Sequence, residues 1–298
     1  MKKESQKAIA LCLCLAILKM RIKKVNRNEY LYSNGIWVRN FTKDKVKSTS
    51  INSMYSTDDF PIIVDNEMEN SFSERISFIS DEKLSFPNIV IISDGFDFIN
   101  KQQILSKLPK NVAILAVNGA LKKWSIYEKR SINFYVINNP YKESQNYLPK
   151  RYFPTCIAST RTNKEFLSNY LGNKYLYVPT PEESLASYFS SSAIWHVDDY
   201  RNPICAAIGL AYKFGVEKLL LFCCDDSFSG ERPSAEELPN GLWQYPQHNI
   251  SQSVIDSNLY WLKNQKNKNL KIGNHSSGRD YNNASYIEAD EILNFFVG

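Results

Sequence analysis

From residue 88 onwards, short apolar runs alternate along the chain with longer polar or amphipathic segments. The apolar runs are rich in Val, Ile and Leu and do not alternate with polar residues, which is typical of strands covered on both faces of a sheet. The predicted strands lie at Asn88–Ile92, Asn111–Val117, Ile132–Ile137, Pro154–Ala158, Lys174–Val178 and Lys218–Cys224, with a weaker one at Asn269–Ile272. Helices are predicted at Asn100–Leu108, Asn163–Leu171, Asn202–Gly215 and Ser251–Lys263. Most intervening segments are long enough for crossovers, so we predict an α/β fold, Rossmann-like and doubly wound, with a mostly parallel sheet and helices on both faces.

The helix that begins near residue 202 has the clearest local signals. Asn202 suits the N-cap position, and Pro203 suits the first helical position because its φ is preset. Apolar residues then recur at helical spacing until Gly215, and the next apolar run ends in Asp225-Asp226. This segment therefore predicts a capped helix that leads into a strand with an acidic end.

The pattern before residue 88 is less regular. We interpret residues 1–87 as a small basic N-terminal extension with a helix and a hairpin, and residues 88–298 as the Rossmann-like domain. Tyr30–Ser33 and Ile36–Arg39 flank Asn34-Gly35, a strong hairpin signal. The short apolar run Pro61–Val64 predicts a strand within an irregular connection. The apolar run Ala8–Leu18 has eleven residues and is too short to span a bilayer, so a buried or interfacial helix is favoured over a membrane anchor.

Composition and charge narrow the class of protein. A hydrophobic fraction of 43% supports a packed core, and the six cysteines form no C-x-x-C pair, which favours a cytoplasmic protein without a structural zinc site. The net charge is +5, but residues 1–50 alone carry 12 Lys/Arg against three Asp/Glu. This basic arm could contact nucleic acid or an anionic membrane, although an ordinary solvated extension is the favoured interpretation.

Ligands of doubly wound sheets bind beyond the carboxyl ends of the strands, which selects the loops to consider. A single glycine follows the first strand, so neither the G-x-G-x-x-G nor the P-loop pattern is present. The two adjacent carboxylates of Asp225 and Asp226, near a phosphate, could hold Mg²⁺ or a ribose hydroxyl. The predicted nucleotide-binding residues are Gly95, Asn118, Gly119, Asn138, Asn202 and Asp226, and Ser159–Arg161 forms a further strand-end loop. Each of these also has an ordinary structural explanation, such as a tight turn or a helix cap.

Three histidines complete the candidate chemistry. His248 lies in a predicted loop just ahead of a helix and could act as a general base, although a lone histidine is more often structural. His196 precedes the capped helix, and His275, beyond the last strand, is the weakest candidate. The sequence has no G-x-S-x-G motif, so acyl hydrolysis has no support.

The strand-end loops at Gly95, Asn118 and Asn138 can be considered together with the segment from Asn202 to Asp225. In combination they resemble the archaeal 6-hydroxymethylpterin diphosphokinase (MptE-like) family. They resemble more distantly the bacterial sialyltransferases that use CMP-sialic acid. The best match is the pattern A-x-x-L-A-x-x-x-G-x-x-x-L-x-L-x-x-x-D, which ends at Asp225. In this comparison Gly95 resembles the glycine of the first phosphate-side loop, and His248 is placed like the general base of the sialyltransferases. The chain departs from both families in its first loop, where only the central glycine is kept.

The resemblance implies two hypotheses, and the departure in the first loop motivates a third. The leading one is a nucleotide-dependent transferase that passes the pyrophosphoryl group of ATP to a small hydroxylated acceptor, with Mg²⁺ at Asp225 and catalysis by Asp225 and His248. The second is a metal-independent glycosyltransferase that uses a CMP-sugar, with His248 as the base. The third is a non-catalytic nucleotide-fold protein that binds a partner or a membrane through its basic arm.

Overall fold

The computed structural model divides the chain into two compact units, Met1–Pro61 and Ile62–Gly298. The residues that the structure describes are 30–33, 36–39, 60–71, 73, 76–79, 84–96, 98–180, 194–225, 236–237, 243–244, 247–265, 269–277 and 280–297. In the first unit, β1 (Tyr30–Ser33) pairs antiparallel with β2 (Ile36–Arg39), which confirms the predicted hairpin. The predicted helix at Ala8–Leu18 and nearly all of the basic arm lie outside the described residues.

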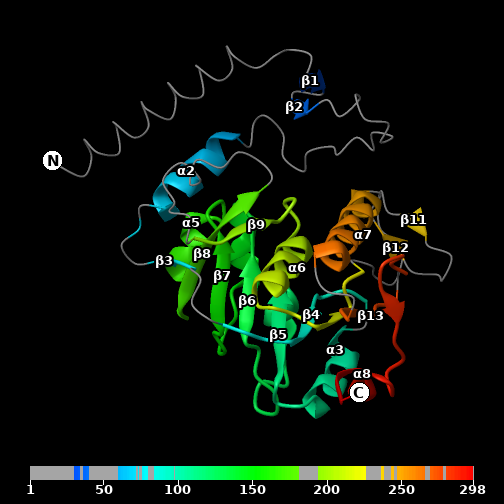
Figure 1. The fold of residues 1–298 in the computed structure, drawn as a ribbon. Helices are drawn as coiled ribbons and strands as arrows, with labels where there is room; N and C mark the ends of the chain where they lie inside the picture. Colours follow the sequence, from blue (N-terminus) through cyan, green and yellow to red (C-terminus); the bar gives the residue numbers. More distant parts are fainter. Residues whose placement is uncertain are drawn as a thin grey trace. The chain divides into compact units, whose positions relative to one another are not determined.

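The second unit is built on a parallel sheet of ten strands (Figure 1). The strand order is β14-β13-β10-β4-β5-β6-β7-β8-β3, with β9 also paired to β8, and every one of these pairings is parallel. The strands are β3 (Ser77–Phe78), β4 (Asn88–Ile92), β5 (Val112–Val117), β6 (Phe134–Ile137), β7 (Thr155–Ser159), β8 (Lys174–Thr180), β9 (His196–Asp198), β10 (Lys218–Phe222), β13 (Lys271–His275) and β14 (Ser285–Tyr286). A separate pair joins β11 (Glu236–Glu237) to β12 (Trp243–Gln244). The predicted Rossmann-like α/β class is confirmed.

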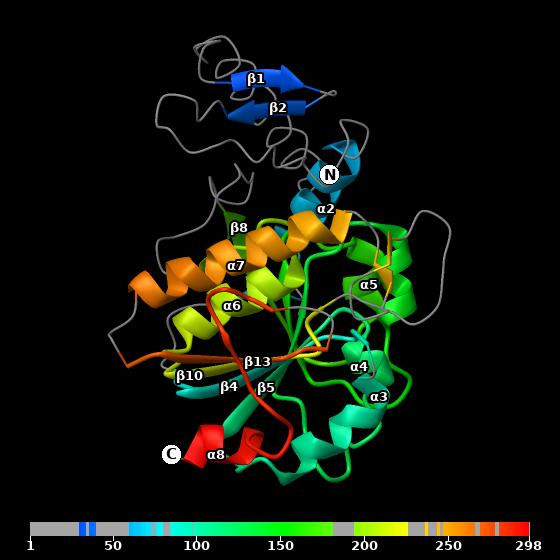
Figure 2. The same cartoon turned by 90° about the vertical axis from the view of Figure 1, so that its right-hand side faces the viewer.

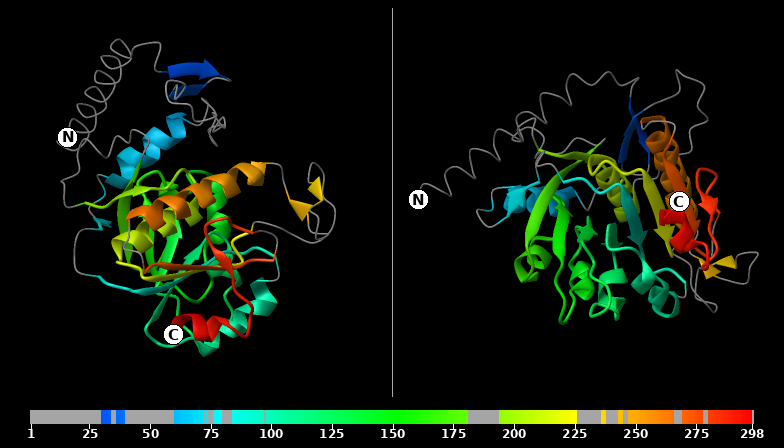
Figure 3. Two further views of the ribbon diagram at one scale, coloured as in Figure 1. Left: turned by 45° about the vertical axis from the view of Figure 1, so that its right-hand side comes forward. Right: turned by 60° about the horizontal axis from the view of Figure 1, so that its bottom comes forward.

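Helices cover both faces of this sheet (Figures 2 and 3). One face packs against α6 (Pro203–Lys213) and α7 (Gln247–Gln265), whose core residues include Leu210 and Leu259. The opposite face packs against α3 (Phe98–Lys101), the 3-10 helices η2 (Gln102–Lys107) and η3 (Lys142–Tyr147), α4 (Ala120–Lys123), α5 (Lys164–Asn169) and α8 (Ile292–Val297). Where one helix was predicted at Asn100–Leu108, the structure has the short α3 followed by η2.

The order of the strands reverses beside β4. The chain passes from β4 through β5, β6 and β7 to β8 in one direction, and α6 then carries it back to β10 on the other side of β4. The carboxyl ends of β4 and β10 therefore form the switch point at which such folds bind ligands.

The structure corrects the prediction for Pro61–Val64, which belongs to a helix and not to a strand. Helix α2 (Phe60–Ser71) buries Ile63, Asn66, Glu67 and Asn70, which follow helical spacing. Three of these four side chains are polar, so the apolar pattern did not reveal the helix. Nearly all of α2, together with β3, lies in the compact unit that starts at Ile62, ahead of the boundary that we placed at residue 88.

Candidate functional site

The loops after β4 and β10 meet directly at the switch point. The N–H of Gly95 donates to the carbonyl of Cys223 at 3.1 Å, and the N–H of Phe96 donates to Oδ1 of Asp225 at 3.2 Å. A Cβ atom on Gly95 would lie 2.1 Å from Oδ1 of Asp225. The missing side chain of Gly95 thus makes room for the buried Asp225 carboxylate, and these two predicted site residues lie together.

Asn118 and Gly119 lie at the end of the neighbouring strand, β5. Asn118 has a left-handed backbone with φ of 49°, and its carbonyl accepts a hydrogen bond from the Tyr135 hydroxyl at 3.2 Å. A Cβ on Gly119 would lie 2.3 Å from the Asp94 carboxylate, which forms a part-exposed ion pair with Lys123 at 3.2 Å. The Asn118 side chain remains half-buried at this edge.

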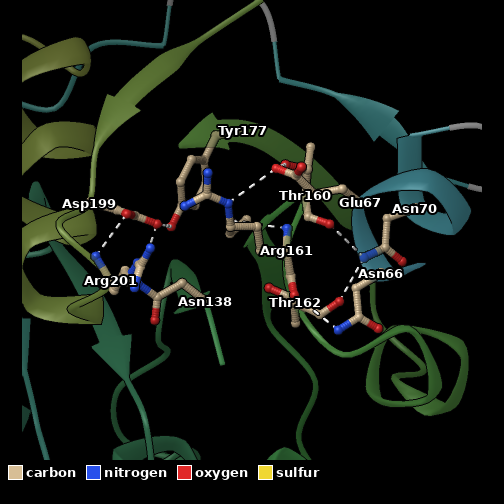
Figure 4. Close-up of polar contacts among 11 residues, drawn as sticks. Asn66, Glu67, Asn70, Asn138, Thr160, Arg161, Thr162, Tyr177, Asp199 and Arg201 are labelled. Atoms are coloured by element: carbon tan, nitrogen blue, oxygen red, sulfur yellow. Dashed lines mark hydrogen bonds and ion pairs between the residues drawn. The ribbon is translucent and has the colours of Figure 1, made fainter. Parts of the chain in front are cut away.

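Asn138, at the end of β6, belongs to a buried network around Asp199 (Figure 4). Oδ2 of Asp199 accepts hydrogen bonds from the Tyr177 hydroxyl at 2.9 Å and from Nδ2 of Asn138 at 3.4 Å. Its Oδ1 accepts from the N–H of Arg201 at 3.0 Å. Burial raises the pKa of Asp199 above its ordinary value, against the opposing charge of Arg161 and these hydrogen bonds.

The turn between β9 and α6 has an unusual backbone. Tyr200 and Arg201 both have positive φ, 45° and 58°, although neither is a glycine, and such residues concentrate at functional sites. Asn202 follows, and its Oδ1 accepts from the N–H groups of Ile204 at 2.8 Å and Cys205 at 3.3 Å. Asn202 is thus the predicted N-cap, and its side chain already accepts from two amides of the first turn.

A second buried cluster joins the loop after β7 to helix α2 (Figure 4). Nε of Arg161 lies 3.2 Å from Oε1 of Glu67, and both side chains are almost fully buried. Asn70 donates to the carbonyls of Thr160 at 2.9 Å and Thr162 at 2.7 Å. The carboxyl ends of β6 and β7 are therefore covered by polar contacts from α2.

The three histidines are placed differently from one another. His248 lies in the first turn of α7, where we predicted a loop. Its side chain lies outside the part of the chain that the structure describes. His196 is the first residue of β9, and burial followed by the charge of Lys213, in the last turn of α6, lowers its pKa. His275 ends β13 and is buried, and its Nδ1 donates to the carbonyl of Ile287 at 2.8 Å. Asp226 lies outside the described residues.

Sequence reasoning named Asn138 but missed the other residues that form the buried networks. Asp199 lies three residues before the N-cap of α6, and Arg161 lies in a strand-end loop that we singled out, so both had a positional signal. Glu67 and Tyr177 had none, because their partners are far away in the sequence. Among the described residues, no group of three or more His, Cys, Asp or Glu side chains could hold a metal ion, and no helix is long and apolar enough to cross a membrane.

No known protein family matches this chain, and a comparison with curated protein sequences finds no match either. Among solved structures, the chain is similar to the MAf glycosyltransferase from Magnetospirillum magneticum AMB-1, with a TM-score of 0.56 and 14% sequence identity. The likeness covers 78% of this chain and 38% of that glycosyltransferase, so the chain spans well under half of its length. At this identity the likeness establishes the fold.

Proposed function

We propose that this chain is a glycosyltransferase that uses a nucleotide-activated sugar, with a CMP-sugar as the first donor to test. The observation that supports this most is the polar carboxyl edge of the sheet, where Asp225, Asn118, Asn138 and Asp199 follow β10, β5, β6 and β9. Carboxylate and amide side chains of this kind hydrogen-bond ribose and sugar hydroxyls. The glycosyltransferase with a similar fold adds support.

The transfer itself needs a base and a site for the leaving group. The oxygen of the acceptor hydroxyl forms a bond to the anomeric carbon of the sugar while the bond from that carbon to the donor phosphate breaks. The phosphate leaves with the electron pair, as a nucleotide anion, and the acceptor proton passes to a base. His248 stays our prediction for that base. Helix α7 ends at Gln265 and leads into β13 at Lys271, so its first turn points back toward the carboxyl edge (Figure 2).

The pyrophosphoryl-transfer hypothesis gains no support from the comparisons. Whether Asp225 holds Mg²⁺ is tested by comparing nucleotide binding with Mg²⁺ and with EDTA. A thermal-shift panel of CMP, UDP, GDP and ATP, each with Mg²⁺ or with EDTA, identifies the nucleotide. Sugar transfer or donor hydrolysis is then measured with the corresponding nucleotide-sugar. We expect a CMP-type ligand to stabilise the protein in EDTA as well as in Mg²⁺.

His248→Ala, with His196→Ala as its matched control, tests the base. General acid–base catalysis contributes about 10²- to 10⁴-fold, so turnover falls by that order in His248→Ala while nucleotide binding is kept. The control variant keeps both. If no nucleotide binds and no donor is consumed, the proposal is wrong. Stabilisation by ATP-Mg²⁺ alone, with pyrophosphoryl transfer, would return the leading place to the diphosphokinase hypothesis.

A further inference from the structure

The ion pair between Arg161 and Glu67 is buried, and a contribution to stability alone does not explain why two charges are buried there. Nε of Arg161 lies 3.2 Å from Oε1 of Glu67, with only 6% and 3% of the two side chains exposed. Removing two charges from water often costs more free energy than their mutual attraction returns, and apolar replacements are frequently as stable. A buried pair at the carboxyl end of a parallel strand therefore calls for a functional explanation.

The rest of the contact shows what α2 covers. We call Asn66, Glu67 and Asn70 the polar docking face of α2. Asn66 donates to the carbonyls of Pro140 at 2.9 Å and Arg161 at 3.3 Å, and its Oδ1 accepts from the N–H of Lys164 at 3.1 Å. Asn70 engages two further carbonyls of the loop after β7. The docking face thus binds backbone groups at strand ends, the groups that ligands contact in doubly wound folds.

Charge indicates which ligand would replace the docking face. The guanidinium of Arg161 faces the Glu67 carboxylate and is close enough to Asp199 to lower the pKa of that group. A guanidinium binds phosphate through paired hydrogen bonds as readily as it binds carboxylate. We propose that Arg161 binds a phosphate group of the nucleotide ligand, and that Glu67 stands in for this phosphate while α2 is docked. The identity of the ligand as a nucleotide rests on the proposed function.

The polar docking face makes it feasible for α2 to leave. Each hydrogen bond within a protein contributes a net of only about 0.5–1.5 kcal/mol, because water replaces the partner that is lost. The contacts of Asn66 and Asn70 are of this replaceable kind. Undocking also returns the Glu67 carboxylate to water, which removes its desolvation cost. A ligand that binds only the undocked state then shifts the population toward that state.

The test measures binding of pyrophosphate, CMP and UDP to the full chain by calorimetry, in wild type and in Glu67→Gln. The glutamine keeps the shape of the side chain and an oxygen that accepts from Arg161, but it removes the competing charge. We expect roughly tenfold tighter binding of the phosphate ligands in Glu67→Gln, within the usual range of coupling between two competing states. In the double variant Glu67→Gln/Arg161→Gln, binding falls below that of wild type.

Asp65→Asn is the matched control. It removes the same charge from the same helix, but the Asp65 ion pair with Lys164 is largely exposed, with side chains 58% and 40% accessible, so affinity does not change. If Glu67→Gln does not fold, Asn70→Ala serves in its place, because it weakens the docking face without touching the ion pair and is expected to tighten binding as well. In a separate measurement on wild type, we expect hydrogen exchange of the α2 amides to become faster when pyrophosphate is added.

Several results would overturn the inference. One is equal affinity for phosphate ligands in wild type and in a folded Glu67→Gln, and another is tighter binding that persists in the double variant. Binding of pyrophosphate that leaves the hydrogen exchange of α2 unchanged would also overturn it, as would the absence of phosphate binding in every variant. The two proposals fail separately. Tighter pyrophosphate binding without sugar transfer leaves Arg161 as a phosphate site and removes the glycosyltransferase. Sugar transfer that is insensitive to Glu67→Gln does the reverse.

Discussion

Helices α6 and α2 both pack on the α/β unit, but α6 is held by apolar contacts and α2 mainly by polar ones. The buried positions of α6 run without a break from Ile204 to Ala211, and every side chain there is apolar, small or a thiol. The described buried positions of α2 are Ile63 and the polar docking face. Apolar burial has no substitute in water, whereas water replaces polar contacts. We therefore expect α6 to leave the sheet only when the protein unfolds, and α2 to leave on its own.

The largest expected effect is on α6. Leu210 is fully buried between the sheet and its neighbours, so Leu210→Ala removes apolar area and leaves a cavity. Substitutions of this kind cost about 2–5 kcal/mol of the free energy of unfolding. Urea denaturation measures the loss, and hydrogen exchange then reports α6 opening together with the strands. If the α6 amides exchanged much faster than the strand amides, α6 would not be held more firmly than α2 and the contrast would be wrong.

A matched pair of asparagines sharpens the comparison at intermediate size. Asn202→Ala removes the N-cap of α6 and is expected to lower the free energy of unfolding by about 1 kcal/mol. Asn66→Ala removes three hydrogen bonds of α2, yet we expect a global change no larger than that of a surface substitution, about 0.5 kcal/mol. Its effect is instead faster exchange of α2 amides. A global loss of about 2 kcal/mol or more, the cost of leaving buried polar groups unpaired, would show that α2 is part of the core.

The smallest effect concerns Asp199, between β9 and α6, and depends on pH. The folded state raises the pKa of Asp199 above its ordinary value of 3.8, mainly through burial. The folded state therefore holds the proton more tightly than the unfolded state, and this contribution is full below pH 3.8 and is lost as pH rises through the raised pKa. Stability of wild type relative to Asp199→Asn should fall as pH increases. A relative stability that rises with pH would mean that Arg161 outweighs desolvation.

Much of the fold could be predicted because it rests on local patterns. Strands β4, β5, β7 and β10 were recognised from unbroken apolar runs, since a strand buried on both faces needs no polar positions. The start of α6 was recognised because an N-cap acts within three residues of itself. The short strands β9 and β14 were missed, since two or three residues give no periodicity.

The candidate site could be predicted only in outline. The strand-end rule selected the loops of Gly95, Asn138, Arg161 and Asp225, because the order of apolar runs implies which ends share an edge. It could not tell that Gly95 makes room for Asp225, because that fact depends on a distance between two residues far apart in the sequence.

The sequence alone determined a parallel α/β sheet, its covering helix α6 and an acidic strand end, because each follows from the spacing of apolar residues or from a local cap. Only the tertiary structure decided that α2 is a helix docked through polar side chains, and that Glu67 meets Arg161, 94 residues away. The physical reason is that buried polar residues look like a solvent-exposed face until their partners are known. Burial of a charge is set by distant groups that satisfy it, and a periodic pattern carries no record of them.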